Sequence, residues 1–448
     1  MKIHNRIFLP AVKILLGLSL VAVMAVLLSS CDGPNFRSAE KLLKAPKLTG
    51  ENLAIQTAFE GAVGTNFTLL TPVTGEYRSS YILKDFDMDG DEECIVLYSV
   101  DGDDSSARFN ILDKNGDQWV SVADISGPGI GVNSVEFNDL YGDELDEIII
   151  TWELIGGSMR SLTVYGGYTA EDLVYGTVKN CVTENYTAFY LAETDNDAKD
   201  EIFIVLRDTV DNSFVASARL LNYDTKEKKF CLVGECSLDP SASDYKSIKF
   251  QKKNGLALFY IDEIVGSAAA TELVLLSDDG LSVPYETVAD TLRSQDRMCA
   301  DYTGDGIIDI PVSVKLPGGV VYSDGEEKNA SLDGLSRATT DGLVLTSTYL
   351  NVSELGFDFD FPDEWQNRIT VQLSVDAETL TFYNYDEQSA QTGFRLFTIA
   401  RQSEDSKIHS EDVLLAKKDG YAYVLQITAD GENAGIQAEY IKEKFSLR

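Results

Sequence analysis

The residues best suited to chemistry in this sequence are acidic, and they gather in four short loops. Each loop carries oxygen-bearing side chains at alternate positions, as in Asp85, Asp87 and Asp89, and each ends on an acid followed by an apolar run. Carboxylates spaced in this way can turn toward one centre, and Ca²⁺ is held by about six to eight oxygen ligands. The loops therefore predict cation binding.

The four loops are numbered 1, 2, 3 and 5 after the repeat units to which they belong. They differ in how completely they match an ideal cation loop. The ideal loop offers side-chain oxygens from its first, third, fifth and ninth residues, a carbonyl from the seventh, and a glycine at the sixth for the sharp turn. The second loop departs most, because Tyr141 and Glu144 stand at its third and sixth positions. The expected calcium ligands are Asp85, Asp87, Asp89, Asp91 (by its carbonyl) and Glu93 in loop 1; Asp139, Asp143 and Glu147 in loop 2; Glu193, Asp195, Asp197, Lys199 (by its carbonyl) and Glu201 in loop 3; and Asp301, Thr303, Asp305 and Asp309 in loop 5.

Acidic loops of this kind have two other interpretations. An EF-hand needs a glutamate at the twelfth position and flanking helices, whereas Val96 and Val312 stand there within β-like runs. The EF-hand is therefore excluded. The second interpretation, that the loops are plain acidic turns between strands, stays open, and it is strongest for loop 2.

The loops recur with a fixed period. They begin at residues 85, 139, 193 and 301, so successive starts are 54, 54 and 108 residues apart. A further unit is expected to start near residue 247, where the acids are missing but the apolar segment 256–261 keeps the register. Repeats of this length, rich in short apolar runs and turn residues, are typical of four-stranded propeller blades. We predict five units, of which the fourth has lost its loop chemistry.

This pattern resembles the FG-GAP or VCBS repeat of integrin-type β-propellers, over roughly residues 65–340. The resemblance implies a mainly β fold with structural Ca²⁺ in the loops and an extracellular location. Propellers of that type usually have seven blades, so five units depart from the family pattern. The expected fold is a β-propeller of about five 54-residue blades followed by a small α+β domain.

The N-terminus predicts export and anchoring. Residues 1–13 are basic, residues 14–28 are apolar, and Ser29-Ser30-Cys31 follows. An apolar run of this length is typical of a signal peptide rather than a membrane span. The segment resembles a bacterial lipobox, which implies lipidation of Cys31 and attachment to the cell membrane. The expected divisions are a signal peptide at 1–30, a tether at 31–49, the propeller at 50–340 and the C-terminal domain at 341–448.

Charge and rare residues exclude several function classes. The chain has 73 acidic and 37 basic residues, a net charge of −36. Because nucleic-acid affinity depends on basic residues that neutralise phosphates, nucleic acid is excluded as a partner. Only two histidines and six cysteines occur, with no metal-type cysteine spacing, which argues against nucleophilic triads and zinc sites. A Cys231–Cys236 disulfide stays open, and Cys94 is expected in the core.

The segment after residue 343 loses the 54-residue period. It contains Phe357, Phe359 and Phe361 in alternation, and then Trp365. These aromatics are either a ligand platform or ordinary core, and the core is favoured. The leading functional hypothesis is a monomeric, non-enzymatic binding or scaffold protein for a surface protein, glycan or wall polymer. The alternatives are a glycan-active enzyme on a five-bladed propeller, which would use two carboxylates, and an envelope assembly factor.

Overall fold

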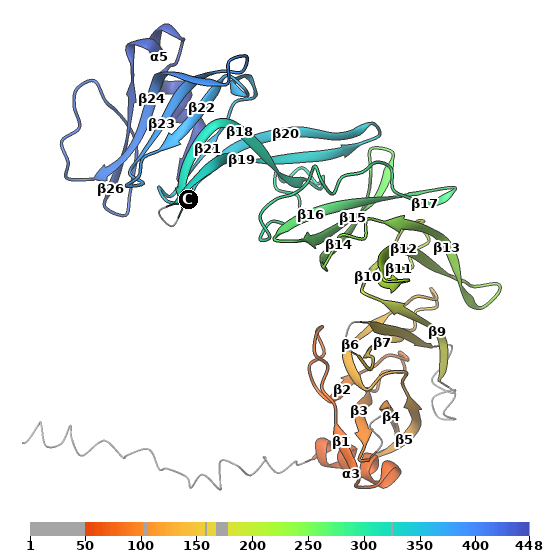
Figure 1. Ribbon diagram of the computed structural model, residues 1–448. Coiled ribbons are helices and arrows are strands. Elements are labelled where there is room, and N and C mark those ends of the chain that lie inside the picture. Colours follow the sequence, from red (N-terminus) through yellow and green to blue (C-terminus); the bar gives the residue numbers. More distant parts are fainter. Residues whose placement is uncertain (1–49, 103–105, 157–158, 167–177, 324–325, 448) are drawn as a thin grey trace, which may run out of the picture. The chain divides into compact units, whose positions relative to one another are not determined.

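The computed structural model describes residues 50–102, 106–156, 159–166, 178–323 and 326–447 (Figure 1). The chain divides into two compact units, residues 1–57 and 58–448. Of the first unit, only residues 50–57 are described, and residues 51–57 belong to helix α3 (Glu51–Val63). The expected signal peptide, tether and Cys31 lie outside the described residues. Within those residues, no helix has the length and apolarity that a bilayer crossing requires.

The second unit is mainly β and consists of consecutive sheets that follow one another along the chain (Figure 1). The sheets are antiparallel apart from one parallel pair of strands in the last sheet. The first sheet contains five strands and the next three contain four each. Their strands are β1 (Phe67–Leu69), β2 (Tyr81–Lys84), β3 (Glu93–Val100), β4 (Ala107–Asn115) and β5 (Gln118–Ser126); β6 (Gly131–Asn138), β7 (Glu147–Glu153), β8 (Arg160–Gly166) and β9 (Lys179–Tyr186); β10 (Ala188–Ala192), β11 (Glu201–Val210), β12 (Ser213–Asp224) and β13 (Lys229–Leu238); and β14 (Asp244–Lys253), β15 (Leu256–Val265), β16 (Ala268–Ser277) and β17 (Gly280–Ser282).

The mainly β fold class is confirmed, and so are blade-like sheets for the first four predicted units. The strands of the fifth unit do not form a separate blade, because they belong to the same ten-stranded sheet as the C-terminal segment. The degenerate unit also has the predicted form, because β14 and β15 place residues 247–261 in a sheet despite the missing acids. In each of the first three sheets the acidic loop leads directly into a strand, β3, β7 or β11. The apolar runs that follow the loops are these strands.

Consecutive sheets pack through shared apolar cores. One core joins the first and second sheets around Phe109 and Trp152, and another joins the third and fourth around Phe203 and Phe259, whose rings stack 3.8 Å apart. The second and third sheets share a core that includes Tyr141. Because the middle sheets are covered on both faces, their central strands read as continuous apolar runs instead of alternating ones.

The first sheet is covered on its other side by Phe59 of α3. Its ring is fully buried and lies 5.1 Å from the ring of Tyr98 and 4.8 Å from that of Phe67. Strand β1, within residues 66–70, stands in the sequence where a strand that closes the ring of a propeller is expected. Instead it pairs with β3 of the same sheet, where Leu69 lies opposite Tyr98. Residues 66–70 therefore complete the first sheet rather than a later one.

The last sheet contains ten strands and includes the C-terminal segment (Figure 1). Its strands are β18 (Ile310–Ser323), β19 (Glu326–Thr339), β20 (Gly342–Val352), β21 (Phe357–Asp360), β22 (Ile369–Leu373), β23 (Thr379–Asp386), β24 (Gln391–Ser403), β25 (Val413–Lys418), β26 (Tyr421–Ile427) and β27 (Phe445–Leu447), with the short helices η1 (Asp363–Trp365), α5 (Ala429–Asn433) and α6 (Ala438–Lys444). The expected boundary between residues 340 and 341 falls at the β19–β20 turn, and the sheet continues across it.

The aromatic run of the C-terminal part is core. Phe357, Phe359 and Phe361 are at most 1% exposed and Trp365 is 7% exposed, and all four belong to one apolar cluster. The favoured interpretation is thus confirmed. Cys94 is buried as expected, and Cys231 and Cys236 are free thiols.

Candidate cation sites in the acidic loops

The four acidic loops share one backbone arrangement. The acid at the ninth position is buried, and one of its carboxylate oxygens accepts the N–H of the second loop residue. These hydrogen bonds measure 3.1 Å from Phe86 to Glu93, 2.8 Å from Leu140 to Glu147, 2.8 Å from Thr194 to Glu201 and 3.0 Å from Tyr302 to Asp309. The ninth-position acid therefore has a role in closing the loop that does not need an ion.

The first residue of the loop is also engaged by the backbone. In loop 5 the carboxylate of Asp301 accepts the N–H groups of Gly304, Asp305 and Gly306 at 2.7, 3.1 and 2.7 Å. In loop 1 Asp85 accepts the N–H of Gly90 at 3.2 Å, where the backbone is left-handed with φ 97°. A glycine at the sixth position permits this conformation without steric cost.

Loop 1 brings three of its predicted ligands together. Oxygens of Asp85, Asp87 and Glu93 lie within 4.8 Å of one another. Asp87 is 5% exposed and Glu93 is fully buried. One buried oxygen of each of the three has no hydrogen-bond partner in the described part of the chain. Buried anionic oxygens without partners are costly unless a cation or a proton reaches them.

Burial also changes the proton affinity of these groups. It raises the pKa of Asp87 to about 6 and that of Glu93 to about 8, and in both cases repulsion from neighbouring acids adds to the effect. Asp113 of β4 belongs to the same group of charges, because it contributes to both shifts. A bound divalent cation would supply the missing positive charge and keep these carboxylates ionised.

Loop 3 brings together a more exposed set. Oxygens of Glu193, Asp195 and Asp197 lie within 4.8 Å of one another, and all three residues are exposed. Lys199 was expected to offer only its carbonyl, but its ammonium group lies 2.6 Å from a carboxylate oxygen of Asp197. Asn222 donates to Asp195 at 3.1 Å. Lys199 therefore offsets part of the negative charge of loop 3.

The buried acid of loop 3 resembles that of loop 1. Glu201 accepts the N–H and the hydroxyl of Thr194 with one oxygen, at 2.8 and 2.6 Å. Its other oxygen has no partner among the described residues, and burial raises its pKa to about 7. Glu201 stays outside the group of three oxygens that converge.

In loop 2 the residue at the third position, Tyr141, packs in the core instead of offering an oxygen. The ring of Tyr141 is buried and stacks on Tyr223 with centroids 3.7 Å apart. Asp139 accepts three backbone N–H groups and Asp143 accepts that of Leu145. Loop 2 does not appear among the convergent carboxylate groups of the described chain. Its predicted ligands Asp139, Asp143 and Glu147 therefore hold backbone rather than converge on one point.

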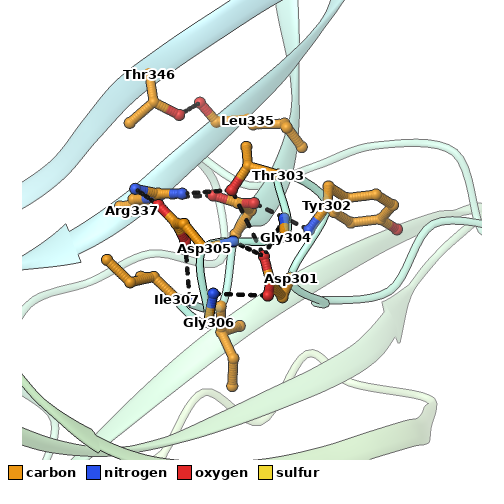
Figure 2. Close-up of polar contacts among 12 residues, drawn as sticks. Asp301, Tyr302, Thr303, Gly304, Asp305, Gly306, Ile307, Leu335, Arg337 and Thr346 are labelled. Carbon is orange, nitrogen blue, oxygen red and sulfur yellow. Dashed lines mark hydrogen bonds and ion pairs between the residues drawn. The ribbon is translucent and has the colours of Figure 1, made fainter.

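Loop 5 contains a cation from the protein itself. Figure 2 shows the guanidinium of Arg337 on β19 pointing into the loop. It contacts Asp309 by Nε at 2.7 Å, Asp305 by one terminal nitrogen at 2.9 Å and the hydroxyl of Thr303 by the other at 2.9 Å. Three of the four predicted calcium ligands are thus already bound by an arginine.

The degenerate fourth unit contributes to the same loop. Lys253 at the end of β14 donates to the carbonyls of Asp305 and Gly306 at 3.1 and 2.7 Å. Gln251 donates to the carbonyl of Gly306 at 3.1 Å and accepts the N–H of Ile308 at 3.1 Å. The residues that replaced the acids of unit four therefore support loop 5.

Sequence reasoning missed Asp113, Asn222 and Arg337. Each lies on the strand after the loop's own strand, 20, 21 and 28 residues beyond the ninth-position acid. Only a hairpin register would have placed them beside the loops. The sequence does contain a polar residue 20 to 28 positions after each of these ninth-position acids, but the distance varies between units.

A second group of buried carboxylates lies away from the loops, in the fourth sheet. Glu263 of β15 is fully buried, and neither of its carboxylate oxygens has a partner within the described residues. It lies opposite Tyr245 of β14. Glu272 of β16 is 4% exposed and accepts the N–H of Asp239 at 3.0 and 3.2 Å. Burial, with repulsion from Glu272, raises the pKa of Glu263 to about 8.

Comparison with known proteins gives no family. No family model and no curated protein matches the sequence. Solved structures with some likeness include Saccharomyces cerevisiae Sqt1 (10% identity, TM-score 0.29, 80% of this chain and 100% of that one), the periplasmic gluconolactonase PpgL of Pseudomonas aeruginosa (10%, 0.26, 73% and 87%) and a Lactobacillus plantarum protein (11%, 0.25, 72% and 84%). All three TM-scores lie well below 0.5, and we draw no conclusion about function from them.

Proposed function

We propose that this chain is a non-enzymatic scaffold or binding protein of the cell surface, whose repeated sheets are stabilised by Ca²⁺ at loop 1 and, more weakly, at loop 3. The observation that supports it best is in loop 1, where buried oxygens of Asp85, Asp87 and Glu93 converge without partners in the described chain. The middle sheets bury both faces against their neighbours, which leaves loops and strand edges to meet a protein, glycan or wall-polymer ligand.

Calcium fits loop 1 better than other common cations. The donors are all oxygens, which suit hard cations, and Ca²⁺ accepts a flexible coordination geometry whereas Mg²⁺ demands a near-ideal octahedron. With a dissociation constant on the order of 10⁻⁴ M and ~1–2 mM free calcium, one site would stabilise the fold by roughly 1.5 kcal/mol. This is a structural role, and no reaction follows from it.

Thermal unfolding of the purified full-length chain tests the cation. We expect a higher melting temperature in millimolar Ca²⁺ than in chelator, and a smaller rise in Mg²⁺ at the same concentration. Identical melting curves in calcium and in chelator would show that the loops are plain acidic turns.

The anchor is proposed from the sequence segment that ends at Cys31. In a bacterial host fed labelled palmitate, the wild-type chain should take up the label and fractionate with membranes. Cys31→Ala should take up none and should appear in the soluble fraction, while Cys181→Ala serves as the matched control. Absence of label in the wild type would contradict the lipobox.

A further inference from the structure

One position in each hairpin faces the ninth-position acid of the acidic loop. It follows the residue that pairs with the first apolar residue after the loop. Ile310 pairs with Ser336, Cys94 with Leu112, Ile202 with Leu221 and Ile148 with Tyr165. The next residue along the partner strand is the facing residue, and in loops 5, 1, 3 and 2 it is Arg337, Asp113, Asn222 and Gly166.

The charge of the facing residue varies from unit to unit, and the charge balance of each loop varies with it. Asp113 is 4% exposed and adds a further negative charge on the strand beside Glu93 of loop 1. Asn222 adds an amide donor that reaches Asp195. Gly166 adds no side chain, and a Cβ atom there would come within 2.6 Å of Glu147. Arg337 adds a full positive charge to loop 5.

The contacts of Arg337 reproduce those expected of an ion. Its Nε and two terminal nitrogens each reach a different side chain, at the third, fifth and ninth positions of the loop (Figure 2). The first position, Asp301, is occupied by three backbone N–H groups. An arginine side chain stays charged at any pH at which the protein is folded. A divalent ion among the same oxygens would lie beside the guanidinium and be repelled.

We propose that the facing residue decides whether a loop needs a metal ion, and that Arg337 is the built-in cation of loop 5. The calcium set that the repeat resemblance implies at Asp301, Thr303, Asp305 and Asp309 does not fit this loop. Lys253 of the fourth unit adds a second positive charge on the loop carbonyls. In loop 1 the facing residue Asp113 is instead negative, so that this loop needs a metal ion. The statement about loop 1 rests on the proposed function, whereas the statement about loop 5 stands without it.

The test combines calcium counting with thermal unfolding of the full-length chain. Bound calcium per chain is measured by equilibrium dialysis for the wild type, Arg337→Gln and Asp301→Asn. Arg219→Gln is the matched control, because Arg219 forms an ion pair with Glu184 away from the acidic loops. Arg337→Gln should bind about one calcium more than the wild type, melt at a lower temperature than the control in chelator, and regain stability in calcium. Asp301→Asn should leave the wild-type count unchanged.

Several outcomes would overturn the proposal. Loss of a bound ion from Asp301→Asn would show that loop 5 holds calcium beside the arginine. Destabilisation of Arg337→Gln without a gained ion would reduce Arg337 to an ordinary ion-pair partner. If Arg337→Gln does not fold, the count for Asp301→Asn decides. A wild type that binds no calcium at all would end the proposal for loop 1, yet the gain in Arg337→Gln would still test loop 5.

Discussion

Asp87→Asn should remove most of the calcium response of the first sheet. In millimolar calcium the variant loses a charged ligand, so the stabilisation of roughly 1.5 kcal/mol expected from this site should largely disappear. In chelator the same change removes one negative charge from a buried group whose neighbours are also acidic, and the fold should be unchanged or slightly more stable. The measurement is the difference between the melting temperatures in calcium and in chelator, for variant and wild type.

The matched control is Asp143→Asn in loop 2. Asp143 stands at the same loop position as Asp89. In loop 2, however, Tyr141 packs in the core instead of offering a ligand, and no convergent group of carboxylate oxygens is found at this loop in the described chain. Its calcium response should equal that of the wild type. An equal loss of response in both variants would mean that calcium acts through general charge screening.

Glu263→Gln should make the protein more stable at alkaline pH and leave it nearly unchanged at mildly acidic pH. The folded-state pKa of Glu263 is raised to about 8 by burial and by the nearby Glu272, above the ordinary value of about 4.3. Between these two values the folded chain keeps a proton that the unfolded chain has lost. The group therefore supports folding fully below its unfolded pKa, and its contribution is lost as the pH rises through about 8.

The size of this effect follows from linkage. In the window between the two pKa values, one such group lowers the free energy of unfolding by up to about 1.4 kcal/mol per pH unit. The stability difference between Glu263→Gln and the wild type should rise from acidic to alkaline pH by a few kcal/mol. Denaturant unfolding in chelator at several pH values measures it, with the metal contribution removed.

Glu235→Gln is the control for this substitution, because Glu235 is exposed on β13. It should shift stability little and by the same amount at every pH. A flat difference for Glu263→Gln would mean that its carboxyl group finds a partner, through a bound water or cation, when it ionises.

The 54-residue register could be predicted because it is carried by residues that serve the loop locally. The ninth-position acid closes the loop through the N–H of the second residue, so both the acid and the apolar strand after it recur at a fixed distance. The fourth unit kept only the strand, since Leu258, Tyr260 and Leu273 pack in a core. In this unit the register is carried by core packing, without the acids of the loop.

The facing residues could not be predicted because their distance along the chain depends on the hairpin. Arg337 follows Asp309 by 28 residues, whereas Asp113 follows Glu93 by 20. The β18–β19 hairpin has fourteen-residue strands and a register shift between Lys315 and Val320. Loop composition therefore indicates which residues carry oxygens but not the charge that faces them, and that charge separates a candidate ion site from an arginine-filled one.

The C-terminal boundary was also hidden from the sequence. The period of the acidic loops stops, which suggests a new domain, yet backbone pairing continues from β19 to β20 and on to β21. Phe357 and Phe359 are core residues of that same sheet. Periodicity describes the loops, and hydrogen bonding describes the sheet, so the two need not end at the same residue.

Strand β19 links the C-terminal core to loop 5. Near its start, Ala330 and Leu332 are embedded in the C-terminal core, and near its end Arg337 occupies loop 5. One strand therefore joins the two places, and its pairing with β20 has a register shift between Leu335 and Ser336. A pull applied to the C-terminal part would load the arginine contacts of loop 5 in the same event, so the fifth unit and the C-terminal part should yield together as one cooperative block.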